Sequence, residues 1–107
     1  MTMRLAIVLI LAGFSTAAMA EPPVVEIRTF QFRPGHLEVK AGTKVLWANQ
    51  DAITHTVTSG TPEARDGRFA QRLEGKGAVT TFELKEPGLY PYFCERHPSM
   101  RGDIRVN

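Results

Sequence analysis

The segment from Tyr90 to Gly102 carries the most evident chemistry, because Cys94, His97 and Met100 follow one another at intervals of three residues. Three residues span at most about 10 Å even when extended, so a turn can aim all three side chains at one point. Zinc binds cysteine, histidine and carboxylate, and a thioether suits it poorly. Soft sulfur ligands combined with imidazole select copper, and a blue-copper site needs two histidines, a cysteine and a weak axial methionine. The segment therefore predicts a copper site that takes one further histidine from elsewhere in the chain.

Two other histidines are available for that position. His55 follows a turn around Asp51 and stands at the entry to a β-prone run, whereas His36 lies far upstream, just before another such run. Loops at one end of a β-sandwich cluster together, so a histidine from a distant loop can meet the loop that contains Cys94. We predict that His55 is the ligand and that His36 is an exposed loop residue.

Simpler interpretations exist for each residue taken alone. A lone cysteine is most often a small buried hydrophobe, and a lone methionine is most often core filler. A catalytic Cys–His pair is a further alternative, but it needs an oxyanion site and an orienting third residue, and the sequence offers no clear candidate for either. Four protein ligands would leave no position free for a substrate. We therefore predict a carrier and not an enzyme.

Length and composition agree with a small metal-binding domain. The chain has 107 residues, one cysteine and a formal net charge of +2. This length fits a single domain, and one cysteine excludes an internal disulfide and a zinc site with several thiolates. The near-neutral charge argues against a nucleic-acid-binding protein. A small exported domain without disulfides often depends on a metal.

Residues 1–20 have the pattern of a cleaved secretory signal peptide. Arg4 precedes an apolar run that begins at Leu5, and the segment ends in Ala18–Met19–Ala20. A positive start, an apolar centre and an A-x-A end define such a peptide. The alternative, a membrane anchor, needs about 20 predominantly apolar residues, and this run is shorter. We predict cleavage after Ala20, export to the periplasm, no stable membrane insertion and a single domain over residues 21–107.

The remainder of the chain reads as short strands separated by Gly, Pro, Asn and Asp, a pattern typical of an all-β sandwich or barrel. We predict strands over Val24–Arg28, Leu37–Lys40, Lys44–Ala48, Thr54–Thr58, Val79–Leu84, Leu89–Cys94 and Ile104–Val106. The charged segment Pro62–Leu73 has only a weak helical apolar pattern and flanking glycines, and we predict a surface loop there.

The segment from Cys94 to Gly102 resembles the copper loop of the cupredoxins, the small blue copper proteins that include plastocyanin, pseudoazurin and amicyanin. Its C-x-x-H-x-x-M spacing is similar to the short loop of amicyanin. Upstream, Val45–Asn49 followed by His55 resembles the strand and first-ligand loop of the family. The resemblance covers residues 24–107 and implies a Greek-key β-sandwich of about seven to eight strands.

Carried over residue by residue, the resemblance implies one type 1 copper with His55, Cys94 and His97 as equatorial ligands and Met100 as the axial ligand. The family usually has asparagine after the first ligand histidine, and it ties the two ligand loops together. This sequence has Thr56 there. Its N–H remains available to the cysteine sulfur, but whether its hydroxyl replaces the asparagine side chain is an open question at this point.

The resemblance also implies an electron shuttle between redox proteins, with His97 as the electron port. Weak, small interfaces are typical of redox encounters, so we predict a monomer. By likeness to amicyanin, the donor would be an amine dehydrogenase and the acceptor a c-type cytochrome. A group of arginines forms a candidate basic collar that steers such partners: Arg65, Arg68, Arg72, Arg96 and Arg101. A different class of function, copper binding for trafficking or tolerance without electron transfer, fits the same ligands.

Overall fold

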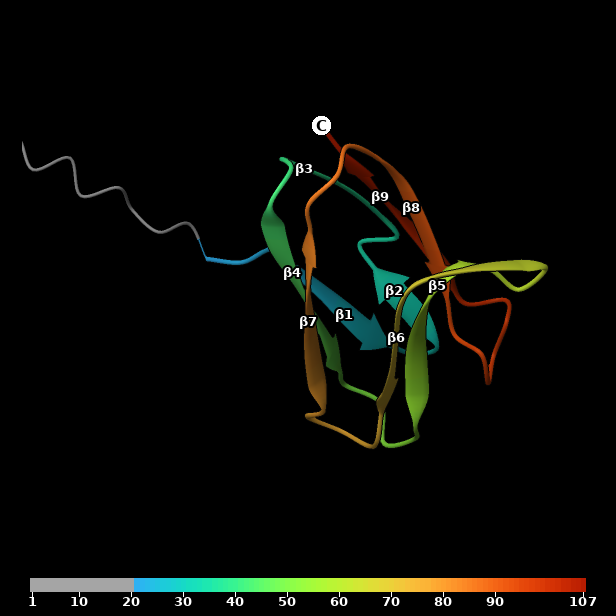
Figure 1. Cartoon of the computed structure of the whole chain (residues 1–107). Helices are drawn as coiled ribbons and strands as arrows, with labels where there is room; N and C mark the ends of the chain where they lie inside the picture. Colours follow the sequence, from blue (N-terminus) through green and yellow to red (C-terminus); the bar gives the residue numbers. More distant parts are fainter. Residues whose placement is uncertain (1–20) are drawn as a thin grey trace, which may run out of the picture.

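The computed structural model describes residues 21–107, and the predicted signal peptide lies outside the described residues. Strands dominate this part of the chain (Figure 1). They are β1 (Val24–Arg28), β2 (Gln31–Arg33), β3 (His36–Val39), β4 (Thr43–Asn49), β5 (His55–Thr61), β6 (Ala64–Leu73), β7 (Val79–Leu84), β8 (Gly88–Phe93) and β9 (Arg101–Val106). Between residues 21 and 107 no helix is long and apolar enough to span a membrane.

The strands form two sheets that pack as a sandwich. One sheet has the order β2-β1-β4-β7, and the other has the order β3-β9-β8-β5-β6. The pairs β1–β4 and β3–β9 are parallel, and the other neighbouring strands run antiparallel. The predicted all-β Greek-key sandwich is confirmed, with nine strands in place of the expected seven to eight.

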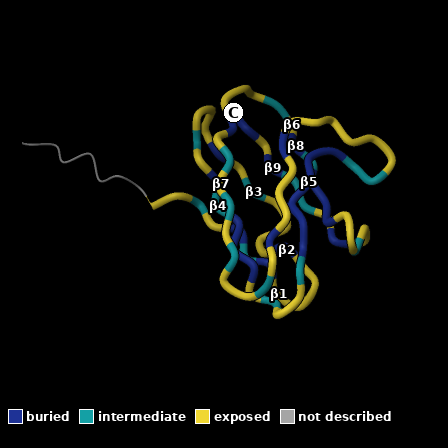
Figure 2. The backbone as a smooth tube through the Cα atoms, turned by 60° about the horizontal axis from the view of Figure 1, so that its bottom comes forward, coloured by how far each residue is buried: buried dark blue, intermediate teal, exposed yellow. Residues whose placement is uncertain are grey.

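The core lies between the sheets, where buried segments of the strands face one another (Figure 2). Side chains alternate across a strand, so Val45 and Trp47 of β4 both point inward. Trp47 is fully buried, and its ring contacts the rings of Phe69, Phe82 and Tyr92 at centroid distances of 5.4 to 5.8 Å. This aromatic centre joins the two sheets and fixes β6 and β8 relative to β4.

The prediction of a surface loop over Pro62–Leu73 is wrong. Residues Ala64–Leu73 form β6, which pairs antiparallel with β5 along its length. Only Phe69 and Leu73 of this strand are buried, so it lacks the alternation that reveals a half-buried strand. Its backbone hydrogen bonds to β5 hold it in the sheet, and these leave no trace in the side-chain pattern.

His36 is the first residue of β3 and is exposed. Its ring contacts the carboxylate of Asp103 on the neighbouring strand β9. The expected exposure is therefore confirmed, whereas the predicted loop position is wrong because β3 begins one residue earlier than its apolar pattern indicates.

Candidate metal centre

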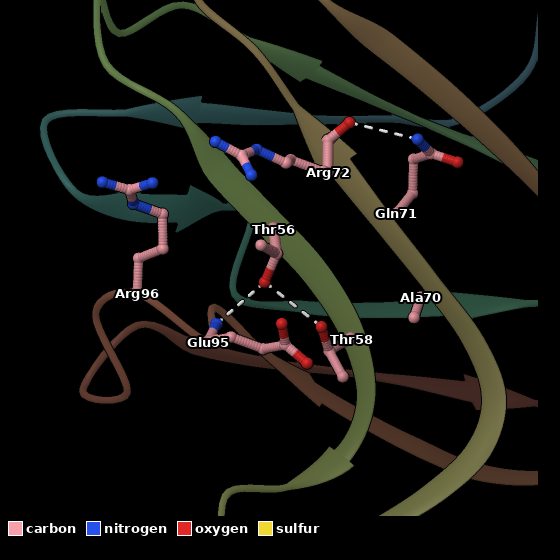
Figure 3. Close-up of a pocket in the computed structure, with 7 residues that line it drawn as sticks. All are labelled: Thr56, Thr58, Ala70, Gln71, Arg72, Glu95 and Arg96. Atoms are coloured by element: carbon pink, nitrogen blue, oxygen red, sulfur yellow. Dashed lines mark hydrogen bonds between the residues drawn. The ribbon is translucent and has the colours of Figure 1, made fainter.

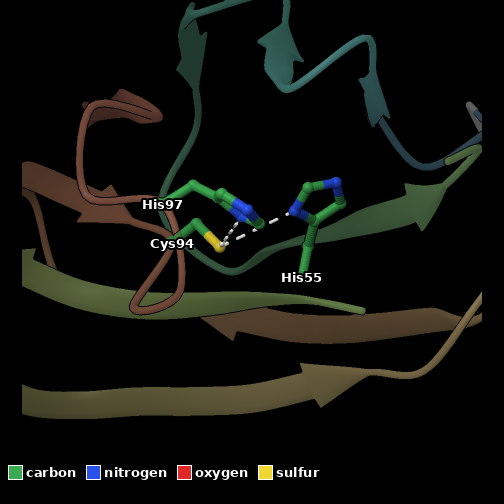
Figure 4. Close-up of side chains that lie close together, drawn as sticks. All are labelled: His55, Cys94 and His97. Carbon is green, nitrogen blue, oxygen red and sulfur yellow. Dashed lines mark hydrogen bonds between the residues drawn. The ribbon is translucent and has the colours of Figure 1, made fainter. Parts of the chain in front are cut away.

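The side chains of three predicted ligands lie close together (Figure 4). One ligand atom each of His55, Cys94 and His97 lies within 4.8 Å of the other two. Cys94 Sγ lies 3.7 Å from Nδ1 of His55 and 4.0 Å from Nδ1 of His97. His36 is not part of this cluster. Two imidazole nitrogens thus face one sulfur across a space of the size that a metal ion needs.

The sheet positions two of these residues directly. His55 is the first residue of β5, and Cys94 immediately follows β8. Because β5 and β8 pair antiparallel, with Thr58 opposite Phe93, the start of β5 lies close to the end of β8. Both side chains are fully buried. The distance between Cys94 and His55 is therefore set by strand pairing.

The loop between β8 and β9 brings in the other two predicted ligands. The Cys94 N–H donates to the Met100 carbonyl at 3.1 Å, and the Met100 N–H donates to the His97 carbonyl at 2.8 Å. These bonds fold the short loop back on itself, so Met100 lies beside Cys94 and is buried. His97 lies midway in the loop and is half-buried. The loop geometry fits the donor set that its spacing predicts.

Comparison with known proteins shows which family this chain belongs to. The profile of copper-binding proteins of the plastocyanin/azurin family matches residues 22–107. Amicyanin-alpha from Methylorubrum extorquens is 32% identical over 100 residues, which cover 90% of this chain and 84% of that protein. The chain belongs to the plastocyanin/azurin family. Its cofactor is copper, and the predicted family resemblance is confirmed.

Two further similarities to known proteins agree with this family assignment. Amicyanin from Paracoccus versutus is 30% identical over 87 residues, which cover 81% of this chain and 66% of that protein, just under two thirds of its length. The crystal structure of amicyanin from the same organism superposes with a TM-score of 0.72 at 29% identity, and covers 82% of this chain and 83% of that chain. Both the sequence and the sandwich are thus those of a cupredoxin.

Thr56 connects the two segments that carry the ligands of this cupredoxin. Its N–H donates to Cys94 Sγ at 3.3 Å. Its hydroxyl oxygen accepts the Glu95 N–H at 2.8 Å and lies 3.1 Å from the hydroxyl of Thr58 (Figure 3). The question left open by the missing asparagine is therefore answered, because the threonine hydroxyl itself ties the start of β5 to the loop after β8.

Asp51 orients His55 and was not identified as a site residue from the sequence. Its Oδ2 lies 2.8 Å from Nε2 of His55. Burial raises the pKa of Asp51, but hydrogen bonds from the Phe30 N–H, the His55 ring and the Thr29 N–H outweigh that effect and lower its pKa below the ordinary value. A proton on Nε2 donated to this carboxylate leaves Nδ1 free as a metal ligand. The four-residue spacing from Asp51 to His55 is the sequence signal for this contact.

Phe30 is the second residue that sequence analysis missed. Its ring makes edge contacts with both His55 and His97, although it comes from the distant β1–β2 connection. Nothing in the sequence near Phe30 indicates this position.

The candidate basic collar is largely neutralised. Four of its five arginines pair with carboxylates at 2.6 to 3.9 Å. The pairs are Arg65–Glu95, Arg68–Asp66, Arg72–Glu74 and Arg101–Glu63. Arg72 and Arg96 also line a polar cavity of about 260 Å³ beside Thr56 (Figure 3). Arg96 is the member of the collar without a carboxylate partner among residues 21–107.

Proposed function

We propose that this protein is a one-electron carrier with a type 1 copper centre that His55, Cys94, His97 and Met100 would hold. The observation that carries the proposal is the approach of two histidine Nδ1 atoms to one buried cysteine sulfur at 3.7 and 4.0 Å. Two histidines, a cysteine and a methionine form the donor set of electron-transfer copper. They leave no protein-provided position for a substrate, so we propose a carrier and not an enzyme.

The copper supplies a one-electron couple when bound, and the residues of the chain hold its surroundings constant. Asp51 fixes the His55 ring, and the Thr56 N–H donates to the Cys94 sulfur, which stabilises the thiolate. Two backbone bonds stiffen the loop of His97 and Met100. Pro98 adds to this, because it fixes its own φ and restricts His97. Ligands that do not rearrange allow electron transfer without a large reorganisation.

We propose that the protein works in the periplasm as a monomer, with residues 1–20 removed as a signal peptide. The apolar pattern of that segment supports export, and the family match begins at residue 22. Similarity to amicyanins supports an amine dehydrogenase as electron donor and a c-type cytochrome as acceptor. The half-buried His97 and the exposed Pro98 and Ser99 form the contact surface for these partners.

The decisive experiment is a visible spectrum and redox titration of the purified protein loaded with Cu(II). We expect an intense blue form that a one-electron reductant bleaches reversibly.

Ligand variants test the assignment of each residue. Cys94→Ser should abolish the colour, and Met100→Leu should keep a coloured centre but shift its potential. His36→Gln is the matched control for His55→Gln, and only the latter should lose the blue centre. A colourless complex, or one that does not cycle, would favour copper trafficking or tolerance over electron transfer.

A further inference from the structure

The Phe30 ring lies across both predicted histidine ligands. Its centroid is 5.5 Å from that of His55 and 5.0 Å from that of His97, with interplanar angles of 86° and 83°. Edge-to-face contacts at such distances are the favoured geometry of aromatic pairs. The Phe30 side chain is nevertheless 49% exposed, so it stands between solvent and the two imidazoles.

The turn that presents Phe30 has an unfavourable sequence. Arg28 pairs with Gln31, so Thr29 and Phe30 form a two-residue hairpin loop between β1 and β2. Their φ angles are +54° and +59°. A hairpin loop with both residues at positive φ strongly prefers Asn-Gly, and a β-branched or bulky residue rarely adopts this conformation. Backbone strain of this kind tends to occur at functional sites.

Asp51 holds the strained turn in place. Its carboxylate accepts the N–H of Thr29 at 2.8 Å and the N–H of Phe30 at 3.1 Å. The same carboxylate contacts Nε2 of His55 at 2.8 Å. One side chain thus fixes both a ligand ring and the turn that places Phe30 over it.

Phe30 also borders a cavity. This cavity has a volume of about 260 Å³ and is lined by Phe30, Gln31, Phe32, Ser99, Met100 and Arg101. Loss of the Phe30 ring would join this space to the imidazole pair. Water would then have a route to the site both from the open surface and from the side of Met100.

We propose that Phe30 is a positioning residue of the copper centre: it covers His55 and His97 against water, and Asp51 holds it there. This inference rests on the proposed function, because it assumes that the two rings bind copper. A covered centre should lose its metal slowly. It should also have a raised reduction potential, because the potential of such sites depends on the hydrophobicity around them.

The test uses Phe30→Gly, because glycine suits the turn and the variant should fold at least as stably as the wild type. We expect copper loss to a strong chelator to accelerate by about tenfold or more, the scale typical of outer-shell changes. We also expect a lower reduction potential of the copper and faster relaxation of water protons by the Cu(II) protein.

Thr29→Asn is the matched control, since it relieves the strain of the turn but keeps the Phe30 ring. This variant should release copper at the wild-type rate. Phe30→Leu should restore much of the protection.

The part played by Asp51 is tested by a double-variant cycle. Asp51→Ala should accelerate copper loss in the wild type but have a smaller effect in the Phe30→Gly background, because residues that act through one another are not additive. Equal effects in both backgrounds would overturn the link to Asp51. If Phe30→Gly lost copper and relaxed water protons at the same rates as the wild type, the covering role would be overturned. A wild-type protein with no blue centre would instead refute the proposed function itself.

Discussion

At the scale of single residues, Thr56 makes two separable contributions to the copper centre. Its N–H donates to the Cys94 sulfur, and its hydroxyl accepts the Glu95 N–H. Thr56→Val keeps the first bond and the side-chain shape but removes the second. We expect a loss of about 0.5–1.5 kcal/mol in the free energy of unfolding, because the partly buried Glu95 N–H loses its acceptor. Chemical denaturation of the apo protein measures this loss.

The matched variant for this position is Thr56→Ser, which retains the hydroxyl. It should recover most of the stability, and its spectrum should stay close to that of the wild type. If Thr56→Val were as stable as Thr56→Ser, the hydroxyl would not be the tie between the two ligand segments. The threonine would then only fill space there.

The residue types in the loop after β8 made the donor set predictable, because the spacing of Cys94, His97 and Met100 is local information. The choice of His55 also followed from sequence, since its loop precedes a strand that a sandwich places at the same end. The cover over the site was not predictable. Phe30 contacts the histidines from a turn whose N–H groups bind Asp51, and Asp51 lies 22 and 21 positions after Thr29 and Phe30 in the chain.

At the scale of elements, the hairpin of β5 and β6 depends on a β-bulge at Gly60. The register shifts between Thr58 and Gly60, and Gly60 has φ of +99°. A Cβ at this position would lie 2.5 Å from the Ala64 carbonyl oxygen and 2.8 Å from the Arg65 Cα. We expect Gly60→Ala to destabilise the fold by about 1–3 kcal/mol through backbone strain and this overlap. Thermal unfolding of the apo protein measures the effect.

Gly35→Ala provides the control for this substitution. Its added Cβ would meet only the Phe32 carbonyl oxygen, at 3.7 Å, which is an ordinary contact. We expect a change within about 0.5 kcal/mol. Equal destabilisation by the two substitutions would show that the bulge carries no special constraint.

The strands show where sequence patterns succeed and where they fail. β1, β4, β7 and β8 were predicted because their residues alternate or include β-branched and aromatic side chains. β6 was missed because most of its side chains face solvent, and the short β2 was missed because Phe32 is its one buried residue. The parallel pairing of β1 with β4 is a long-range contact that no local pattern encodes.

At the scale of the whole molecule, four of the five arginines of the collar are paired with carboxylates, and Arg68 stacks on Tyr90, away from the predicted ligands. The five guanidinium groups of the collar are opposed by the carboxylates of Glu63, Asp66, Glu74 and Glu95, which leaves a net charge of one. Electrostatic steering requires a surplus of one sign over an extended surface. Partner recognition should therefore depend mainly on the less polar surface at His97, where the contacting residue Phe30 is 49% exposed.

This charge balance predicts a shallow salt dependence for electron transfer. We expect the oxidation of the reduced protein by anionic ferricyanide to slow only modestly as ionic strength rises. The slope should correspond to an apparent protein charge near +1, whereas five unpaired arginines would give the slope of a charge of +5. Glu74→Gln removes the partner of Arg72 and should raise the apparent charge by one. Glu38→Gln on β3, which lies outside the collar, should leave the slope closer to that of the wild type. The contradicting outcome is a steep salt dependence of the wild-type rate that Glu74→Gln does not change. The arginines would then act as free charges despite their partners, and the basic collar would direct the encounter.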